Sequence, residues 1–113
     1  MTNNTCDLNQ KNCMPCEGGV PSLTKHEAEK LLTQLKDWQL AEDPLRLSKN
    51  FSFKNFYHTM AFVNAIAWMA NQENHHPDLE VGYNYCRVNY HTHAINGLSE
   101  NDFICAAKID QLL

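Results

Sequence analysis

Three histidines stand out in this sequence because imidazole side chains exchange protons near neutral pH. His75 and His76 are adjacent and are followed by Pro77, and His93 lies further along the chain. The unperturbed pKa of histidine is roughly 6.5, which suits both an acid and a base in one pocket. A proline disfavours helical backbone at the residue before it, so the pair should lie where a helix gives way to an extended segment. We therefore expect two imidazoles at a helix end and a third at a strand end to converge on one site.

Two other interpretations of these histidines stay open. Histidines also gather on protein surfaces near helix C-termini, where the helix dipole favours cations. In addition, His91 and His93 are two residues apart, so on a strand both side chains point to the same face. Together with His75 or His76 they offer three imidazole ligands for zinc. Adjacent residues such as His75 and His76 do not easily bind one ion together, which weakens the metal hypothesis.

The cysteines are a further candidate. Cys13 and Cys16 have the two-residue gap of a zinc knuckle or a redox pair, but zinc needs a second pair of ligands and Cys6 is the one other thiol nearby. A redox motif would need a strand before it and a helix after it, and neither is evident, so plain reduced thiols are the favoured interpretation. Cys86 and Cys105 lie in strand and helix patterns and are expected to be small core residues.

The composition narrows the class of protein. The 113 residues suit one domain, and 43% hydrophobic with 19% charged residues is typical of a folded chain. The net charge of −4, with no lysine–arginine cluster, argues against direct binding of nucleic acid. No stretch of roughly 18 apolar residues predicts a membrane span, and no export signal is evident. The odd number of cysteines, five, then favours a cytoplasmic protein with reduced thiols.

The apolar spacing predicts an α+β fold. Residues 1–21 form an irregular lead-in, broken by glycine and proline, and residues 22–113 form a single domain. The 54–74 segment carries an apolar surface wide enough to be covered on more than one side. The predicted elements are a helix over 24–36 with a Thr24–Glu27 capping box, strands over 38–40 and 45–53, a helix over 54–74, one bent strand or a strand pair within 79–93, and a final helix capped by Ser99 and Asp102. This order favours a mostly antiparallel sheet backed by helices.

Several motifs together resemble one known family. The motifs are Glu73-Asn74-His75-His76-Pro77-Asp78, Val81-Gly82-Tyr83-Asn84, Thr92-His93, Gly97-Leu98-Ser99-Glu100-Asn101-Asp102-Phe103 and the lead-in Cys16-Glu17-Gly18-Gly19-Val20-Pro21. The chain resembles the pterin-4a-carbinolamine dehydratase family, in its bacterial form, over nearly its whole length. Each motif alone is weak, but the combination is specific.

The resemblance implies both a fold and a reaction. The implied fold is a four-stranded antiparallel sheet with about three helices packed on one face, assembling as homodimers or homotetramers. The implied reaction removes water from 4a-hydroxytetrahydrobiopterin to give quinonoid dihydropterin, which recycles the pterin cofactor of aromatic amino-acid hydroxylases. The family needs no metal and no organic cofactor, so the implied partners are the pterin and further copies of the chain, without nucleic acid or membrane.

The resemblance also implies roles for individual residues. His75 and His93 are expected to be the acid–base pair, and His76 joins the catalytic group by binding and orienting the pterin. The other expected substrate-binding residues are Pro77, Asp78, Glu73 and Trp68. One departure is Asn71, which stands where many members carry a glutamate. That departure bears on the rate more than on the type of reaction.

A non-catalytic role is the main alternative to this function. Animal members of the family also serve as dimerisation partners of a homeodomain transcription factor through a helical surface. A binding protein of that kind would keep the fold and the apolar helix surface without accelerating the dehydration.

Overall fold

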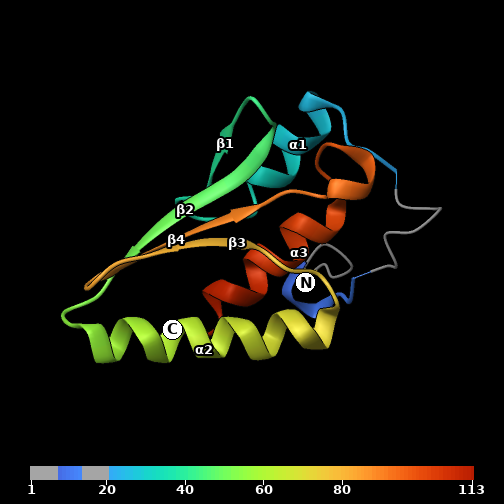
Figure 1. The fold of residues 1–113 in the computed structure, drawn as a ribbon. Helices are drawn as coiled ribbons and strands as arrows, with labels where there is room; N and C mark the ends of the chain where they lie inside the picture. Colours follow the sequence, from blue (N-terminus) through green and yellow to red (C-terminus); the bar gives the residue numbers. More distant parts are fainter. Residues whose placement is uncertain (1–7, 14–20) are drawn as a thin grey trace.

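The protein is a four-stranded antiparallel sheet packed against helices, as predicted. The structure is a computed structural model that describes residues 8–13 and 21–113. The sheet order is β1-β2-β4-β3, and α2 runs along one side of the sheet (Figure 1). The elements are η2 (Leu8–Gln10), α1 (Lys25–Leu32), β1 (Gln39–Ala41), β2 (Arg46–Ser52), α2 (Phe56–Glu73), β3 (Asp78–Val81), β4 (Tyr85–Tyr90), η3 (His93–Ile95) and α3 (Glu100–Asp110).

The first helix begins as predicted but ends earlier. Thr24 and Glu27 form a capping box, in which each side chain accepts a hydrogen bond from the other residue's backbone N–H, at 3.1 and 2.8 Å. The prediction of a helix to residue 36 was wrong, because α1 ends at Leu32. Beyond it the N–H groups of Thr33 and Gln34 bond three residues back, which tightens the chain into turns.

Asparagines cap both ends of the long helix α2. The Asn55 side chain accepts from the His58 N–H at 2.9 Å, and Asn74 ends the helix in the left-handed conformation at φ 53°. Its buried residues, which pack into the core, include Phe62, Ile66 and Met69. Neither α2 nor any other helix within residues 8–13 and 21–113 is long and apolar enough to cross a membrane.

Alternate residues of the two central strands face the helices. Leu47 and Phe51 of β2, and Cys86, Val88 and Tyr90 of β4, are buried in the core. The α3 helix closes this core, with most of its residues buried, and its far end meets the sheet where Lys49 contacts Asp110 at 3.0 Å. The core positions of Cys86 and Cys105 are confirmed.

The segment after β3 resolves one open alternative and corrects another prediction. A turn between β3 and β4 makes them a strand pair rather than one bent strand, and the Gly82 N–H bonds to the Tyr85 carbonyl there at 3.0 Å. The expectation that the strand runs to His93 was wrong. β4 ends at Tyr90, and His93 begins the short helix η3, which an antiparallel bridge between Thr92 and Gly97 closes into a compact loop.

A short part of the lead-in packs onto α3. Leu8, at the start of η2, is buried in the core, and Lys11 pairs with Glu100 at 2.6 Å. The Cys13 N–H donates to Glu73 Oε1 at 2.8 Å, and Lys108 lies 3.4 Å from the same carboxylate. Residues 8–13 are called the N-terminal strap below. Burial alone would raise the pKa of Glu73, but the hydrogen bond from Cys13 and the Lys108 ammonium outweigh burial and lower the pKa from its usual 4.5.

Replacing Glu73 with glutamine should lower the free energy of unfolding at pH 7 by about 1 kcal/mol, because the charged acceptor of the strap is lost. Since the pKa of Glu73 is lower in the folded protein, this stabilisation is present above the usual value of 4.5 and is lost as the pH falls through the folded value. Urea unfolding of both proteins at pH 7 and about pH 3 measures the difference, which should shrink at the acid pH. Glu29→Gln, at an exposed position of α1, is the control. An equal difference at both pH values would contradict the role of the charge.

Candidate functional site

His75 is buried at the end of α2 and is held by a carboxylate. Its side chain is 6% exposed, and Nε2 donates to Asp102 Oδ1 at 2.7 Å. The imidazole stacks on the Tyr90 ring, with centroids 5.5 Å apart and planes inclined by 7°. The backbone N–H of His75 donates to the Ala70 carbonyl at 3.1 Å, so the residue stays bonded to α2 beyond the left-handed turn at Asn74. Both position and orientation of this ring are therefore fixed.

Asp102 connects His75 to a second part of the chain. Its carboxylate is fully buried, and Oδ2 accepts from the Thr92 hydroxyl at 2.8 Å and from the Ser99 N–H at 2.9 Å. The hydroxyl oxygens of Thr92 and Ser99 are themselves 2.9 Å apart. A buried carboxylate is stable only where donors surround it, and here the donors come from α2, from the η3 loop and from the start of α3. The Asp102 side chain thus accepts hydrogen bonds from three segments of the chain.

His93 follows directly after Thr92 and is exposed. Its ring contacts that of His91 edge to face, with centroids 5.0 Å apart and planes inclined by 78°. The His91 Nδ1 donates to the Leu45 carbonyl at 2.9 Å, which fixes His91 against the chain before β2. The Asp102 carboxylate therefore binds His75 through one oxygen and Thr92, the residue before His93, through the other.

His76 points away from this buried cluster. The side chain is exposed, and Nε2 donates to Asn71 Oδ1 at 3.0 Å. Asn71, which stands where the resemblance implies a glutamate, thus contacts His76 through a neutral amide. Pro77 follows, and Asp78 is exposed at the first position of β3. The chain turns from helix to strand over these residues, as the position of the proline predicted.

Glu73 and Trp68 border a different hollow, of about 380 Å³, between α2, α3 and η2. Trp68 is 68% exposed there, whereas the Glu73 carboxylate is engaged by the Cys13 N–H and by Lys108. The structure thus gives Glu73 a role in anchoring the strap. Contact of either residue with a pterin stays a prediction.

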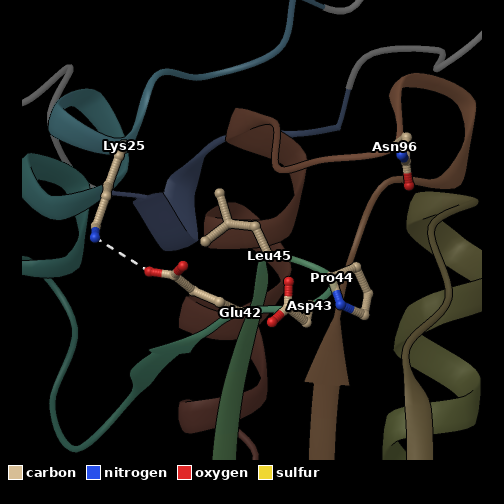
Figure 2. A pocket seen from close by; sticks show the side chains of 6 residues that line it. All are labelled: Lys25, Glu42, Asp43, Pro44, Leu45 and Asn96. Carbon is tan, nitrogen blue, oxygen red and sulfur yellow. Dashed lines mark hydrogen bonds and ion pairs between the residues drawn. The ribbon is translucent and has the colours of Figure 1, made fainter.

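A second hollow, of about 320 Å³, is lined by residues of α1, of the chain before β2 and of the η3 loop. Figure 2 shows its lining residues, with the Lys25 ammonium of α1 pointing at the Glu42 carboxylate, 3.1 Å away. Asn96 reaches it from the η3 loop and Leu45 from the chain before β2. The lining includes none of the three candidate histidines, so this hollow is not a site for them.

The metal hypothesis finds no support in the contacts. Within residues 8–13 and 21–113, no three side chains of histidine, cysteine, aspartate or glutamate come together as ligands for an ion. Cys6 and Cys16 lie outside the described residues, so the Cys13–Cys16 motif is described only at Cys13.

The second role of Asp102 was not predicted from the sequence. The Ser99–Asp102 spacing correctly predicted a capping box for α3. The bond to His75, 27 residues away, leaves no local signal, because periodicity and caps report only on near neighbours. The stacking of Tyr90 on His75 was missed for the same reason. The one hint in the sequence is that Asp102 stands directly before the apolar residues Phe103 and Ile104.

Solved structures with the same fold carry related names. The transcriptional coactivator/pterin dehydratase from Brucella melitensis has a TM-score of 0.78 and 30% identity, over 81% of this chain and 98% of that one. A pterin dehydratase-like protein identified as a RuBisCO assembly factor in the alpha-carboxysome has a TM-score of 0.59 and 28% identity, over 68% of this chain and 89% of that one.

Related sequences agree with the structural comparison. A protein of Nitrosomonas eutropha, provisionally named pterin-4-alpha-carbinolamine dehydratase, is 68% identical over 97% of this chain and 96% of its own length. A protein of Legionella pneumophila (strain Corby) with the same provisional name is 63% identical over 96% of this chain and 97% of its own. The family model described as pterin 4 alpha carbinolamine dehydratase matches residues 21–112. The chain therefore belongs to the pterin 4 alpha carbinolamine dehydratase family.

Proposed function

We propose that this protein dehydrates 4a-hydroxytetrahydrobiopterin to quinonoid dihydropterin and water. One observation carries the proposal beyond family membership: the buried Asp102 carboxylate holds His75 on one oxygen and, on the other, the residue next to His93. This arrangement supports two imidazoles acting at neighbouring positions. The relatives' names support the reaction class.

The chemistry asks for two proton transfers. The departing 4a-hydroxyl must receive a proton, and a ring nitrogen of the pterin must lose one, so that water leaves as the quinonoid double bond forms. His75 and His93 form the acid–base pair for these transfers, and His76 binds and orients the pterin. Asp102 orients the His75 ring and stabilises the positive charge that the ring gains when it takes up a proton, as in other carboxylate–histidine pairs. We further propose that Pro77 and Asp78 contact the polar edge of the pterin.

His75→Ala and His93→Ala should each lower kcat roughly 10²- to 10⁴-fold, because each removes one proton-transfer group. The measurement is the dehydration of freshly generated 4a-hydroxytetrahydrobiopterin, followed by ultraviolet absorbance above the spontaneous rate. His26→Ala, on the exposed side of α1, is the matched control and should keep full activity.

The same assay separates the enzyme from the second candidate, a non-catalytic binding protein. That candidate draws support from the coactivator name of the Brucella melitensis structure and from the exposed aromatic residues of α2. A folded wild-type protein that leaves the spontaneous rate unchanged would reject the dehydratase and favour the binding protein.

Asp102→Asn should lower kcat roughly ten- to a hundredfold and change KM little, because Asp102 acts through His75 and not on the substrate. In a His75→Ala background the same replacement should cost clearly less than in the wild type, because one of the two histidines that Asp102 positions is gone. A double-mutant cycle on kcat measures this coupling. Fully additive losses in folded proteins would show that Asp102 does not act through His75. Circular dichroism and the unfolding midpoint of each variant report on folding.

We also propose that the active form is a homo-oligomer. Several large apolar side chains on α2 and the β3–β4 pair stay exposed in a single chain, namely Phe56, Tyr57, Trp68, Val81, Tyr83 and Tyr85. The rings of Phe56 and Tyr83 stack with centroids 6.4 Å apart, and exposed apolar side chains that cluster in this way are typical of subunit contacts. β3 is also an edge strand whose outer side is unpaired within the described sheet.

Light scattering coupled to size exclusion should give a mass of two or four chains for the wild type. Tyr57→Glu, which places a charge on the most exposed of these aromatic side chains, should shift the mass toward a smaller species. Lys54→Gln, at an exposed polar position just before α2, makes the same change in net charge and is the control. A wild type that runs as a single chain at micromolar concentration would contradict the proposal.

A further inference from the structure

Two cysteines far apart in the sequence meet beside the candidate site. The sulfur atoms of Cys13 and Cys105 lie 3.4 Å apart, although the residues are 92 positions apart in the chain. Cys105 is fully buried in α3, one helical turn after Asp102, and Cys13 is half-buried at the end of the strap. The Cys13 thiol also lies 3.8 Å from the Asn101 carbonyl.

From this contact we propose that Cys13 and Cys105 form a redox pair, in which a disulfide made by exchange with a low-molecular-weight disulfide fastens the strap to α3. The strap is hydrogen-bonded to Glu73, which lies two residues before His75 at the end of α2. The redox state of the two cysteines therefore sets how firmly this end of α2 is held.

The strap is already positioned for this bond. Leu8 is buried in the core, Lys11 pairs with Glu100 at 2.6 Å, and the Cys13 N–H is bonded to Glu73. A disulfide bond is about 2.05 Å long, so the two sulfur atoms need to approach by only somewhat more than 1 Å. The contacts of Leu8, of Lys11 and of the Cys13 backbone keep the thiol facing Cys105 while it does so.

Exchange with glutathione disulfide accounts for all the atoms and electrons, and no other oxidant is needed. The Cys13 thiolate attacks one sulfur of glutathione disulfide and releases one glutathione thiol, which leaves a mixed disulfide on Cys13. The Cys105 thiolate then attacks the Cys13 sulfur and releases the second glutathione thiol. The protein loses two hydrogen atoms in total, and one glutathione disulfide is reduced to two thiols.

The accessibility of the two thiols sets the order of these steps. Cys13 is the partly exposed member and meets the oxidant first, whereas Cys105 is buried and acts as the resolving thiol. The hydrogen bond with Cys105 and burial both raise the pKa of Cys13, so Cys13 rests as a thiol and reacts slowly at neutral pH. Cys86 offers a contrast: burial raises its pKa to about 11, and it lies in β4 within the core.

The test uses the full chain, incubated in a glutathione buffer rich in the oxidised form at about pH 8, where more of the thiol ionises. Trypsin cuts after lysine and arginine, so Cys13 and Cys16 fall in peptide 12–25 and Cys105 in peptide 88–108. We expect these two peptides to be joined, with fragmentation placing the link on Cys13. Cys16→Ser should keep the link, and Cys13→Ser should lose it.

Three outcomes would overturn the proposal. They are a link placed on Cys16, a disulfide closed within peptide 12–25, and thiols that stay reduced throughout in the folded protein. A second readout is the melting temperature, which the disulfide should raise by about 10 °C over the reduced wild type, because it closes a long loop of chain. Oxidised and reduced Cys13→Ser should melt alike. An unchanged melting temperature in the linked wild type would show that the bond does not fasten the strap.

Discussion

The structure around the candidate site depends on one buried carboxylate. Asp102 is fully buried, and it accepts hydrogen bonds from a side chain at the end of α2, a side chain before η3 and the backbone at the start of α3. An ionised group away from water is costly unless such donors compensate it, and hydrogen bonds to a charged acceptor are stronger than neutral ones. Loss of any one of these hydrogen bonds would leave the buried carboxylate poorly compensated, so Asp102 holds the three segments together.

This constraint joins stability and chemistry in the same side chain. As a helix cap, Asp102 satisfies the backbone N–H of Ser99, which α3 leaves without a partner. As the partner of His75, it fixes one imidazole in a single orientation against Tyr90. Through Thr92 it also places the loop that presents His93. In the proposed site His76 and His93 are exposed, whereas His75 is largely buried and its orientation is set by Asp102 and Tyr90.

Local signals in the sequence predicted local structure well. The capping boxes at Thr24 and Ser99, the turn into Pro77 and the antiparallel α+β fold were all confirmed, because caps, prolines and periodicity act between near neighbours. Two errors also have local causes, since the end of α1 and the loop after Tyr90 are set by turns that apolar spacing does not encode. The contacts of Asp102 with His75 and of Cys13 with Cys105 join residues far apart in the chain, so only the assembled fold brings them together.

If the three candidate histidines form one pterin site organised by Asp102, one ligand should affect all three together. Long-range ¹H–¹⁵N NMR of the imidazole rings measures this during titration with a tetrahydropterin that lacks the 4a-hydroxyl and cannot be dehydrated. We expect His75 to have its proton on Nε2 before ligand is added. The resonances of His75, His76 and His93 should then move together and saturate at one concentration, while those of the exposed His26 and His58 stay in place. Resonances of the three histidines that stay still, or that saturate at different concentrations, would contradict a single site.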